Sequence, residues 1–465
     1  MILKKDNCVE IKKSKGFTDS EKMLSEICDN TFLKLWSYVN PFNNESKEFC
    51  DLVAIFENHM FIFFDRDKKL DFLDNEDFQI KWNRWYKDVI EAQIKTCHGA
   101  ERYIKNGGEL FLDNKLSIKL PISFKSSKLI IHKIIVAHGA RDACLKFSDE
   151  NINGSLGITY TFSDIKLPFF VTLDRENIIH VFDSHNLVII LKELDTFIDF
   201  KNYIEEKEST IRKSTFLTYC GEEDLLAYYL MNFDQTENRH FIGKKDYLGI
   251  TLDQGVWNRF FKSPAYNVKK QMNNVSYFWD TLIQEVCDNA LEDKLTGNGN
   301  IFNGNSAIYE MAKEPRFMRR MLSENMLDAI HNFPNNNSPM GRFIRILPSY
   351  YENVKYVFLQ YRIDFGYDDK RERDKMRQYF LEIACGATKI KFQDTEKIIG
   401  IGMEPIKYYP NTIKDFLLMD CKIWDNEKQK YYTEENKLDG NRFFLTGNEN
   451  YQEFHVKEFP NSRLR

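Results

Sequence analysis

The sequence contains no uninterrupted apolar run of the roughly 18 or more residues that a membrane-spanning helix needs. Residues 1–6 also lack the apolar core of a signal peptide. The nine cysteines are scattered, odd in number and without a CxxC pair, so neither a disulfide framework nor a structural zinc site is predicted. We therefore expect a cytoplasmic protein with reduced thiols and no membrane partner.

Proline and glycine are sparse, at 11 and 21 of 465 residues, and neither sign of charge predominates, with 65 Lys and Arg against 70 Asp and Glu. A net charge of -5 does not indicate nonspecific nucleic-acid binding by bulk charge, although it is compatible with a local basic groove. Aromatic residues make up 14% of the chain and hydrophobic residues 43%. This composition excludes a mainly disordered or fibrous chain and predicts sizeable cores in two or three domains.

The apolar patterns predict an α/β (α+β) fold in three parts. Residues 1–148 are expected to form a mixed sheet flanked by helices. Residues 149–300 are expected to form a mainly helical middle α+β region for recognition or interaction, and residues 301–465 a C-terminal α/β domain. The boundaries are set by the polar stretch 149–154 and by the Gly- and Asn-rich stretch 296–305.

The segment 47–68 carries the most informative pattern. Two short apolar runs, 52–56 and 60–64, are separated by three polar residues, which predicts a β-hairpin. Asp51 precedes the first run and Asp65 follows the second. Because the start of one hairpin strand lies beside the end of the other, the two carboxylates are predicted to meet at one edge of the sheet.

Asp67 follows Asp65 by two residues, so both side chains are expected on one face of the strand. Converging carboxylates repel each other unless a cation lies between them. Ligands that are all oxygen, with space for water, favour Mg2+ or Mn2+, which polarise a phosphoryl oxygen and activate water. The alternative interpretation is that 65–68 is a charged turn at the end of a core hairpin, with Asp51 a solvated strand start.

The order of helix, hairpin, acids and second helix over residues 18–140 resembles the PD-(D/E)xK superfamily, the restriction-endonuclease-like nucleases. The resemblance implies that Asp51 and Asp65 hold Mg2+ or Mn2+. It also implies an assisting acid on the first helix, where Glu26 fits. Glu48, just before the hairpin, is interpreted as a surface residue.

The sequence departs from the family pattern at the lysine that normally lies two residues after the second acid. That position is Asp67. The role of the lysine, to orient the nucleophile or to stabilise transition-state charge, would then pass to Lys68 or to Lys95 on the predicted helix 82–105. Strand alternation places Lys68 on the wrong face unless the strand ends in a bend.

The resemblance implies a metal-dependent endonuclease that hydrolyses phosphodiester bonds, in DNA by analogy, with a possible role in prokaryotic restriction or antiviral defence. Residues beyond 150 would then recognise a substrate, a protein partner or a second copy of the chain. The alternative hypothesis is a catalytically inactive protein of the same fold that binds nucleic acid or acts as a scaffold. The missing lysine at position 67 favours this alternative.

The remaining motifs are interpreted as structural. The nine histidines are dispersed, and His180 and His185 flank the end of a predicted strand. The acids of 221–224 open a predicted helix, where they interact favourably with its dipole, and this is preferred to a second metal site. A salt-bridged helix face is likewise preferred to phosphate contacts for three arginines: Arg316, Arg319 and Arg320.

Overall fold

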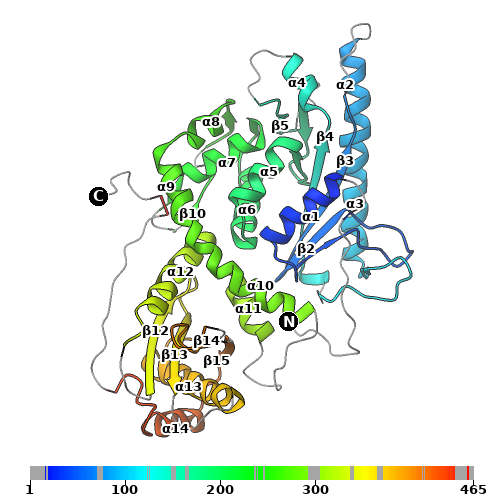
Figure 1. Ribbon diagram of the computed structural model, residues 1–465. Coiled ribbons are helices and arrows are strands. Elements are labelled where there is room, and N and C mark those ends of the chain that lie inside the picture. Colours follow the sequence, from blue (N-terminus) through cyan, green and yellow to red (C-terminus); the bar gives the residue numbers. More distant parts are fainter. Residues whose placement is uncertain are drawn as a thin grey trace. The chain divides into compact units, whose positions relative to one another are not determined.

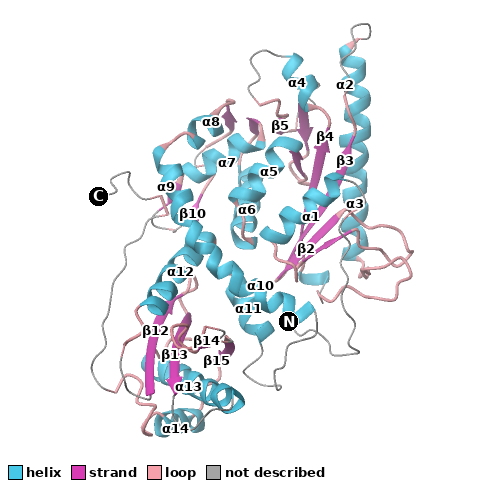
Figure 2. Cartoon of the chain, in the orientation of Figure 1, coloured by secondary structure: helices cyan, strands magenta, loops and turns pink. Residues whose placement is uncertain are grey.

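The structure is a computed structural model that describes residues 16, 19–70, 77–122, 124, 126–147, 153–162, 167–234, 237, 239–243, 247–291, 304–335, 340–363, 370–410, 412, 414–445 and 458–459. It is mixed α/β, with sheets flanked by helices (Figures 1 and 2), so the predicted α+β class is confirmed. The chain forms two compact units, Met1–Asn267 and Val268–Arg465.

The first sheet of unit 1 is a five-stranded mixed sheet in the order β1-β2-β3-β4-β7. Strands β1, β2 and β3 pair antiparallel, whereas β3, β4 and β7 pair parallel. Every residue of β2 is buried, as are the first six of β3, which explains why both strands are nearly continuous apolar runs. The strands are β1 (Ser37–Val39), β2 (Leu52–Phe56), β3 (His59–Asp67), β4 (Ile130–His138) and β7 (His180–Asp183).

Helices lie on both faces of this sheet. On one face, Phe32 directly after α1 stacks on Phe61 of β3 and meets Phe197 and Phe200 of α6 edge-on. Helix α3 packs against β3 and β4, and Figure 1 shows α2 and α3 as one long helical arm beside these strands. The helices and helical turns are α1 (Asp19–Thr31), α2 (Phe78–Tyr86), η1 (Lys87–Glu91, a π-helix), α3 (Ala92–Lys105), η2 (Ser126–Lys128), α4 (Arg141–Phe147), α5 (Ser184–Glu193) and α6 (Phe197–Lys213).

The interval predicted as a mainly helical middle region contains a second sheet. This sheet has four strands, in the order β11-β8-β5-β6. It also supplies β7 to the first sheet, so that sheet continues beyond residue 148. The described chain therefore divides near residue 267, whereas the sequence suggested boundaries near 148 and 300. The further elements of unit 1 are β5 (Gly157–Tyr160), β6 (Phe170–Leu173), β8 (Leu217–Cys220), α7 (Glu222–Met231), β9 (Phe233–Asp234), β10 (Arg239–His240), β11 (Ile250–Leu252) and α8 (Val256–Phe261), with α9 (Pro264–Asn273) at the boundary.

Unit 2 contains a four-stranded sheet in the order β12-β13-β14-β15, in which only β13 and β14 pair parallel. The long helix α13 packs on this sheet through a core that includes Leu381, Ala384 and Cys385. The elements are η3 (Asn274–Ser276), α10 (Tyr277–Leu291), α11 (Gly304–Ala312), α12 (Arg316–His331), β12 (Met340–Pro348), β13 (Val354–Ile363), α13 (Lys370–Lys391), β14 (Lys397–Met403), β15 (Asp415–Asp420) and α14 (Asn426–Glu435). In the part of the chain that is described, no helix has the length and apolar character needed to cross a bilayer.

Asp280 of α10 joins two of the arginines on α12. Its carboxylate accepts hydrogen bonds of 2.7 Å from Arg316 and from Arg319, whose side chains are only 6% and 1% exposed. The third arginine, Arg320, is also buried and donates to Asn273. The arginines therefore lie inside the unit, and the interpretation as a salt-bridged helix face is confirmed for Arg316 and Arg319.

Removal of the Asp280 carboxylate is expected to destabilise unit 2. Asp280→Ala leaves two buried guanidinium groups without their anion, and breaking a buried pair in this way costs about 3–5 kcal/mol. Glu285→Ala on the same helix is the matched control, because Glu285 pairs with Lys414 at the surface and such pairs contribute at most about 1 kcal/mol. Unfolding in urea, monitored by hydrogen exchange of amides in unit 2, measures the free energy of unfolding of both variants. Equal losses of stability in the two variants would contradict this assignment.

Candidate metal centre

The edge of the first sheet at the end of β3 brings Asp51 and Asp65 together. The register of the hairpin pairs Leu52 with Phe63, which places Asp51 beside the last part of β3. The Oδ2 atom of Asp51 accepts a 2.7 Å hydrogen bond from the backbone N–H of Asp65. The side chain of Asp65 is only 4% exposed, so neither acid is a freely solvated group at the tip of a turn.

A histidine completes this edge of the sheet. His138, at the end of β4, places Nε2 2.5 Å from Oδ1 of Asp65, and its Nδ1 lies 2.7 Å from Oγ of Ser184. Burial lowers the pKa of His138, but the contact with Asp65 and the charge of Asp67 outweigh it, so the pKa is raised overall. The nitrogen-bearing side chain in contact with Asp65 is therefore an imidazole rather than a lysine.

Gly139 allows the chain to turn immediately after His138. Its φ angle is +88°, in the region that favours glycine, and a Cβ atom there would lie 2.2 Å from the carbonyl oxygen of Lys68. The N–H of Leu70 donates to the carbonyl of Gly139. The segments that leave β3 and β4 are thus held together directly beyond the candidate site.

Asp51 lies in a group of acids that disfavour its charged form. Its pKa is raised to about 7, first by burial and then by the charges of Asp65, Glu48 and Glu21, while the hydrogen bond from the Asp65 N–H opposes the shift. The amide of Asn40 donates to Glu48 over 2.6 Å and to Glu21 over 3.3 Å. Four carboxyl groups, one from α1, two from the β1–β2 connection and one from β3, thus gather around one edge of the sheet.

The acid that α1 contributes differs from the one that the sequence suggested. Glu26 is exposed on α1, whereas Glu21 of the same helix reaches Asn40. Five residues turn an α-helix by about 140°, so the two side chains point in different directions. In the sequence, Glu21 ends a Thr-x-x-Glu pattern, which predicts a helix start and not a site residue. Thr18 itself lies outside the described residues.

The two candidate lysines lie at the surface. Lys68, directly after β3, pairs with Asp88 of the π-helix η1, and its carbonyl accepts a hydrogen bond from the indole of Trp85. Lys95 is exposed on α3, and Asp67 is exposed at the end of β3. None of the contacts of these residues described here joins them to Asp51. The geometry therefore does not assign the role of the missing lysine to Lys68.

The donor atoms at this edge suit a hard divalent cation. Asp51 and Asp65 supply carboxylate oxygens, and Mg2+ is commonly held by one or two carboxylates while it keeps several waters. Burial is the main cause of the raised pKa of Asp51, and the smaller contribution from repulsion by neighbouring acids would be relieved by a cation between them. The residues present therefore fit the Mg2+ or Mn2+ that the sequence suggested.

The acids at the start of α7 have different partners. Glu222 pairs with the buried Lys207 over 2.6 Å, and Asp224 accepts backbone hydrogen bonds from Gly255 and Trp257. Glu223 accepts from Ser155 over 2.7 Å. All three acids are buried in the first turn of α7, where the preferred helix-start interpretation had placed them.

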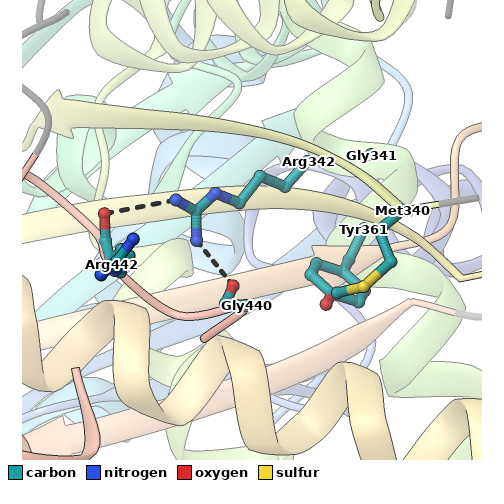
Figure 3. A pocket seen from close by; sticks show the side chains of 6 residues that line it. All are labelled: Met340, Gly341, Arg342, Tyr361, Gly440 and Arg442. Atoms are coloured by element: carbon teal, nitrogen blue, oxygen red, sulfur yellow. Dashed lines mark hydrogen bonds between the residues drawn. The ribbon is translucent and has the colours of Figure 1, made fainter. Parts of the chain in front are cut away.

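A pocket in unit 2 offers no comparable chemistry (Figure 3). It is lined by Met340, Gly341, Arg342, Tyr361, Gly440 and Arg442. The guanidinium of Arg342 donates to the carbonyl oxygens of Gly440 and Arg442 over 2.7 and 3.2 Å. Since its lining includes no carboxylate, thiol or imidazole, we do not assign a catalytic role to this pocket.

Comparisons with known proteins found no relative that bears on the role of this site. No family model matches the chain, and neither the search of curated proteins nor the search of solved structures finds a match. Functional inference therefore depends on the sequence pattern and the site itself.

Proposed function

We propose that this protein is a divalent-metal-dependent nuclease that hydrolyses phosphodiester bonds, with Asp51 and Asp65 as metal ligands. The observation that carries the proposal is the contact between the Asp51 carboxylate and the Asp65 backbone at a buried sheet edge. The order α1, hairpin β2–β3, helical arm α2–α3 and β4 also supports it, because the resemblance to PD-(D/E)xK nucleases rests on that order.

The side chains at this edge have distinct roles in the proposed reaction. The bound cation would polarise a phosphoryl oxygen and supply an activated water. Asp51 and Asp65 would supply carboxylate oxygens to the ion, and the backbone N–H of Asp65 fixes the orientation of the Asp51 carboxylate. The imidazole of His138 contacts Ser184 through Nδ1 and Asp65 through Nε2. Because Ser184 holds the ring in place, His138 positions the carboxylate of Asp65.

DNA is the proposed substrate and prokaryotic restriction or antiviral defence the proposed setting, both by the family resemblance alone. The cytoplasm is the proposed location because the cysteines are scattered and form no disulfide pattern. The acidic net charge confines nucleic-acid contacts to a local groove. We therefore expect only a modest fall in affinity as salt rises, since the slope follows the number of phosphates neutralised. A protein partner or a second copy of the chain would use residues beyond 150.

Metal removal provides the direct test of this proposal. Plasmid DNA is incubated with the full chain and Mg2+ or Mn2+, with and without excess EDTA. We expect cleavage with the metals, background levels with EDTA, and recovery when Mg2+ is restored, because the carboxylates alone do not activate water. Asp51→Asn should behave as the chelated protein does. Cleavage that persists in EDTA, or equal cleavage by Asp51→Asn, would refute the assignment.

A catalytically inactive DNA-binding protein of the same fold is the second candidate. Two observations favour it: residue 67 is aspartate where the family has lysine, and His138 contacts Oδ1 of Asp65 directly. Fluorescence anisotropy with labelled duplex DNA separates the two. Retained binding without cleavage under any of the tested metals would support the inactive protein.

A further inference from the structure

A second group of metal-binding side chains lies within unit 1. His132 comes from β4, His180 from β7 and Glu208 from α6. Oε1 of Glu208 is 2.8 Å from Nδ1 of His132 and 3.3 Å from Nε2 of His180. Their potential ligand atoms all lie within 4.8 Å of one another, and within the described residues no other group of three or more His, Cys, Asp or Glu does so.

This group is separate from the acids at the sheet edge. His132 precedes His138 by six residues on the same strand, which corresponds to about 20 Å at the usual rise of a β-strand. The side chains of His132 and His180 are 1% and 0% exposed, and that of Glu208 is 10% exposed. The group therefore lies in the interior of unit 1 and is not placed to contact a nucleic-acid substrate.

The surroundings of Glu208 and His132 hold both side chains in place. Arg212 donates to Oε2 of Glu208 over 3.0 Å, which leaves Oε1 directed at the two imidazoles. On the far side of His132, Nε2 lies 3.0 Å from Nδ1 of His59. Metal-bound histidines commonly donate their outer N–H to such an acceptor, which fixes the tautomer. His59 thus gives His132 the outer partner that a ligand needs.

His180 shows an unfilled polar position. Its Nδ1 atom is buried and has no hydrogen-bond partner, so the ring is held on the Nε2 side alone. Buried polar groups are almost always paired, and an orphaned ring nitrogen in a fully buried histidine is unusual. The unpaired atom is not the proposed ligand atom Nε2, which faces Glu208 at 3.3 Å, so an ion at Nε2 leaves Nδ1 as an outer nitrogen without a partner.

The ionisation of His180 and Glu208 is compatible with metal binding, which requires a neutral imidazole and an ionised carboxylate. Burial lowers the pKa of His180 to about 4, with the charge of Lys207 acting in the same direction. Burial raises the pKa of Glu208, but the hydrogen bonds from His132 and His180 outweigh it and lower the pKa overall. Where the ring nitrogens that face Glu208 carry N–H groups, an ion at those nitrogens displaces the protons, so metal binding releases protons.

We propose that His132, His180 and Glu208 bind one divalent transition-metal ion, Zn2+ by preference. Two imidazole nitrogens and one carboxylate oxygen form a donor set that favours such ions over Mg2+. Three protein ligands leave a fourth position for a water molecule. Because the group is buried, the ion links β4, β7 and α6 and stabilises unit 1, and it takes no part in the proposed nuclease reaction.

Metal content of the full chain is the first measurement. The protein is produced in zinc-supplemented medium, passed through a chelating column and analysed by inductively coupled plasma mass spectrometry. We expect about one Zn2+ per chain. Asp51→Asn combined with Asp65→Asn should leave this stoichiometry unchanged, so loss of the proposed nuclease site and loss of the zinc site are distinguishable. A wild-type chain without any transition metal would overturn the proposal.

Variants then identify the ligands. Glu208→Gln and His180→Gln keep polar side chains of similar size and should lose the ion. His185→Gln is the matched control, because His185 lies near the end of β7 outside the group and should retain it. Equal zinc in all four proteins would contradict the ligand assignment. If the ligand variants do not fold, the decisive result is the wild-type spectrum after Co2+ is added, where nitrogen ligation gives visible absorption bands and oxygen-only ligation gives far weaker ones.

Discussion

Asp65→Asn is expected to reduce divalent-metal-dependent DNA cleavage by about 100-fold to 1,000-fold, since a metal ligand contributes several kcal/mol of charge stabilisation and each 1.36 kcal/mol is tenfold in rate. Asparagine preserves the size of the side chain and one carbonyl oxygen, but it removes the negative charge. The backbone N–H of Asp65, which holds the Asp51 carboxylate, is unchanged by the substitution. The expected loss is therefore in metal binding and rate rather than in the fold. Rates measured over a range of Mg2+ concentrations test this.

Asp67→Asn provides the matched control. Asp67 is two residues further along the same strand and carries the same charge, but it is exposed. We expect its cleavage rate to stay within about threefold of wild type, because charges at solvated positions act weakly. If both variants cleaved DNA at the wild-type rate, the sheet edge would not be the active site. If only Asp67→Asn were inactive, the ligand set would have to be moved outwards along β3.

A substitution at position 67 can also test whether adding the missing lysine increases cleavage. Asp67→Lys restores the residue that the PD-(D/E)xK resemblance requires. A large gain in cleavage would show that the chain carries a metal site of weak catalytic power. No gain would indicate that His138, in contact with Asp65, already occupies the space of the cationic group. Binding of duplex DNA by both proteins is measured alongside.

Local patterns in the sequence predicted most of the elements that build the site. The hairpin was predicted from the runs 52–56 and 60–64, and β2 and β3 match them closely because buried strands must be apolar throughout. The helix predicted near 222–231 is α7, Glu222–Met231. The apolar pattern over 307–329 favours a single helix, but the structure has two, α11 and α12, because Pro315 disfavours helical geometry in the residue before it.

Other parts of the structure depend on contacts between distant residues. The short apolar run 110–112 favours a strand from its sequence, but in the structure it forms only isolated bridges at Phe111. The sheet continues into β7, which is brought to β4 by a connection of more than forty residues. Glu21 is recognisable as a site residue only once its distance from Asn40 is known. The three proposed zinc ligands come from separate elements, so no spacing motif identified them.

Lys207→Met is expected to be the most destabilising of the single substitutions considered for unit 1. Lys207 and Glu222 are both fully buried, and the ammonium donates to both carboxylate oxygens over 2.6 and 2.7 Å. The hydroxyls of Tyr203 and Tyr219 donate to the same carboxylate over 2.6 Å each. Methionine fills a similar volume but leaves Glu222 as a buried anion that only two neutral donors stabilise. Loss of one partner of a buried pair costs about 3–5 kcal/mol.

The free energy of unfolding is measured by titrating the protein with urea and monitoring spectroscopic probes placed in unit 1. Lys213→Met is the control. Lys213 is exposed in the last turn of the same helix, so its substitution should change stability by less than about 0.5 kcal/mol. The double variant Lys207→Met with Glu222→Gln separates charge from packing. If the uncompensated anion causes the loss, neutralising Glu222 should recover much of the stability, because no buried charge then remains. A double variant as unstable as Lys207→Met would mean that the cation–π contacts of the ammonium with Tyr160 and Phe182, rather than the ion pair, account for the lost stability.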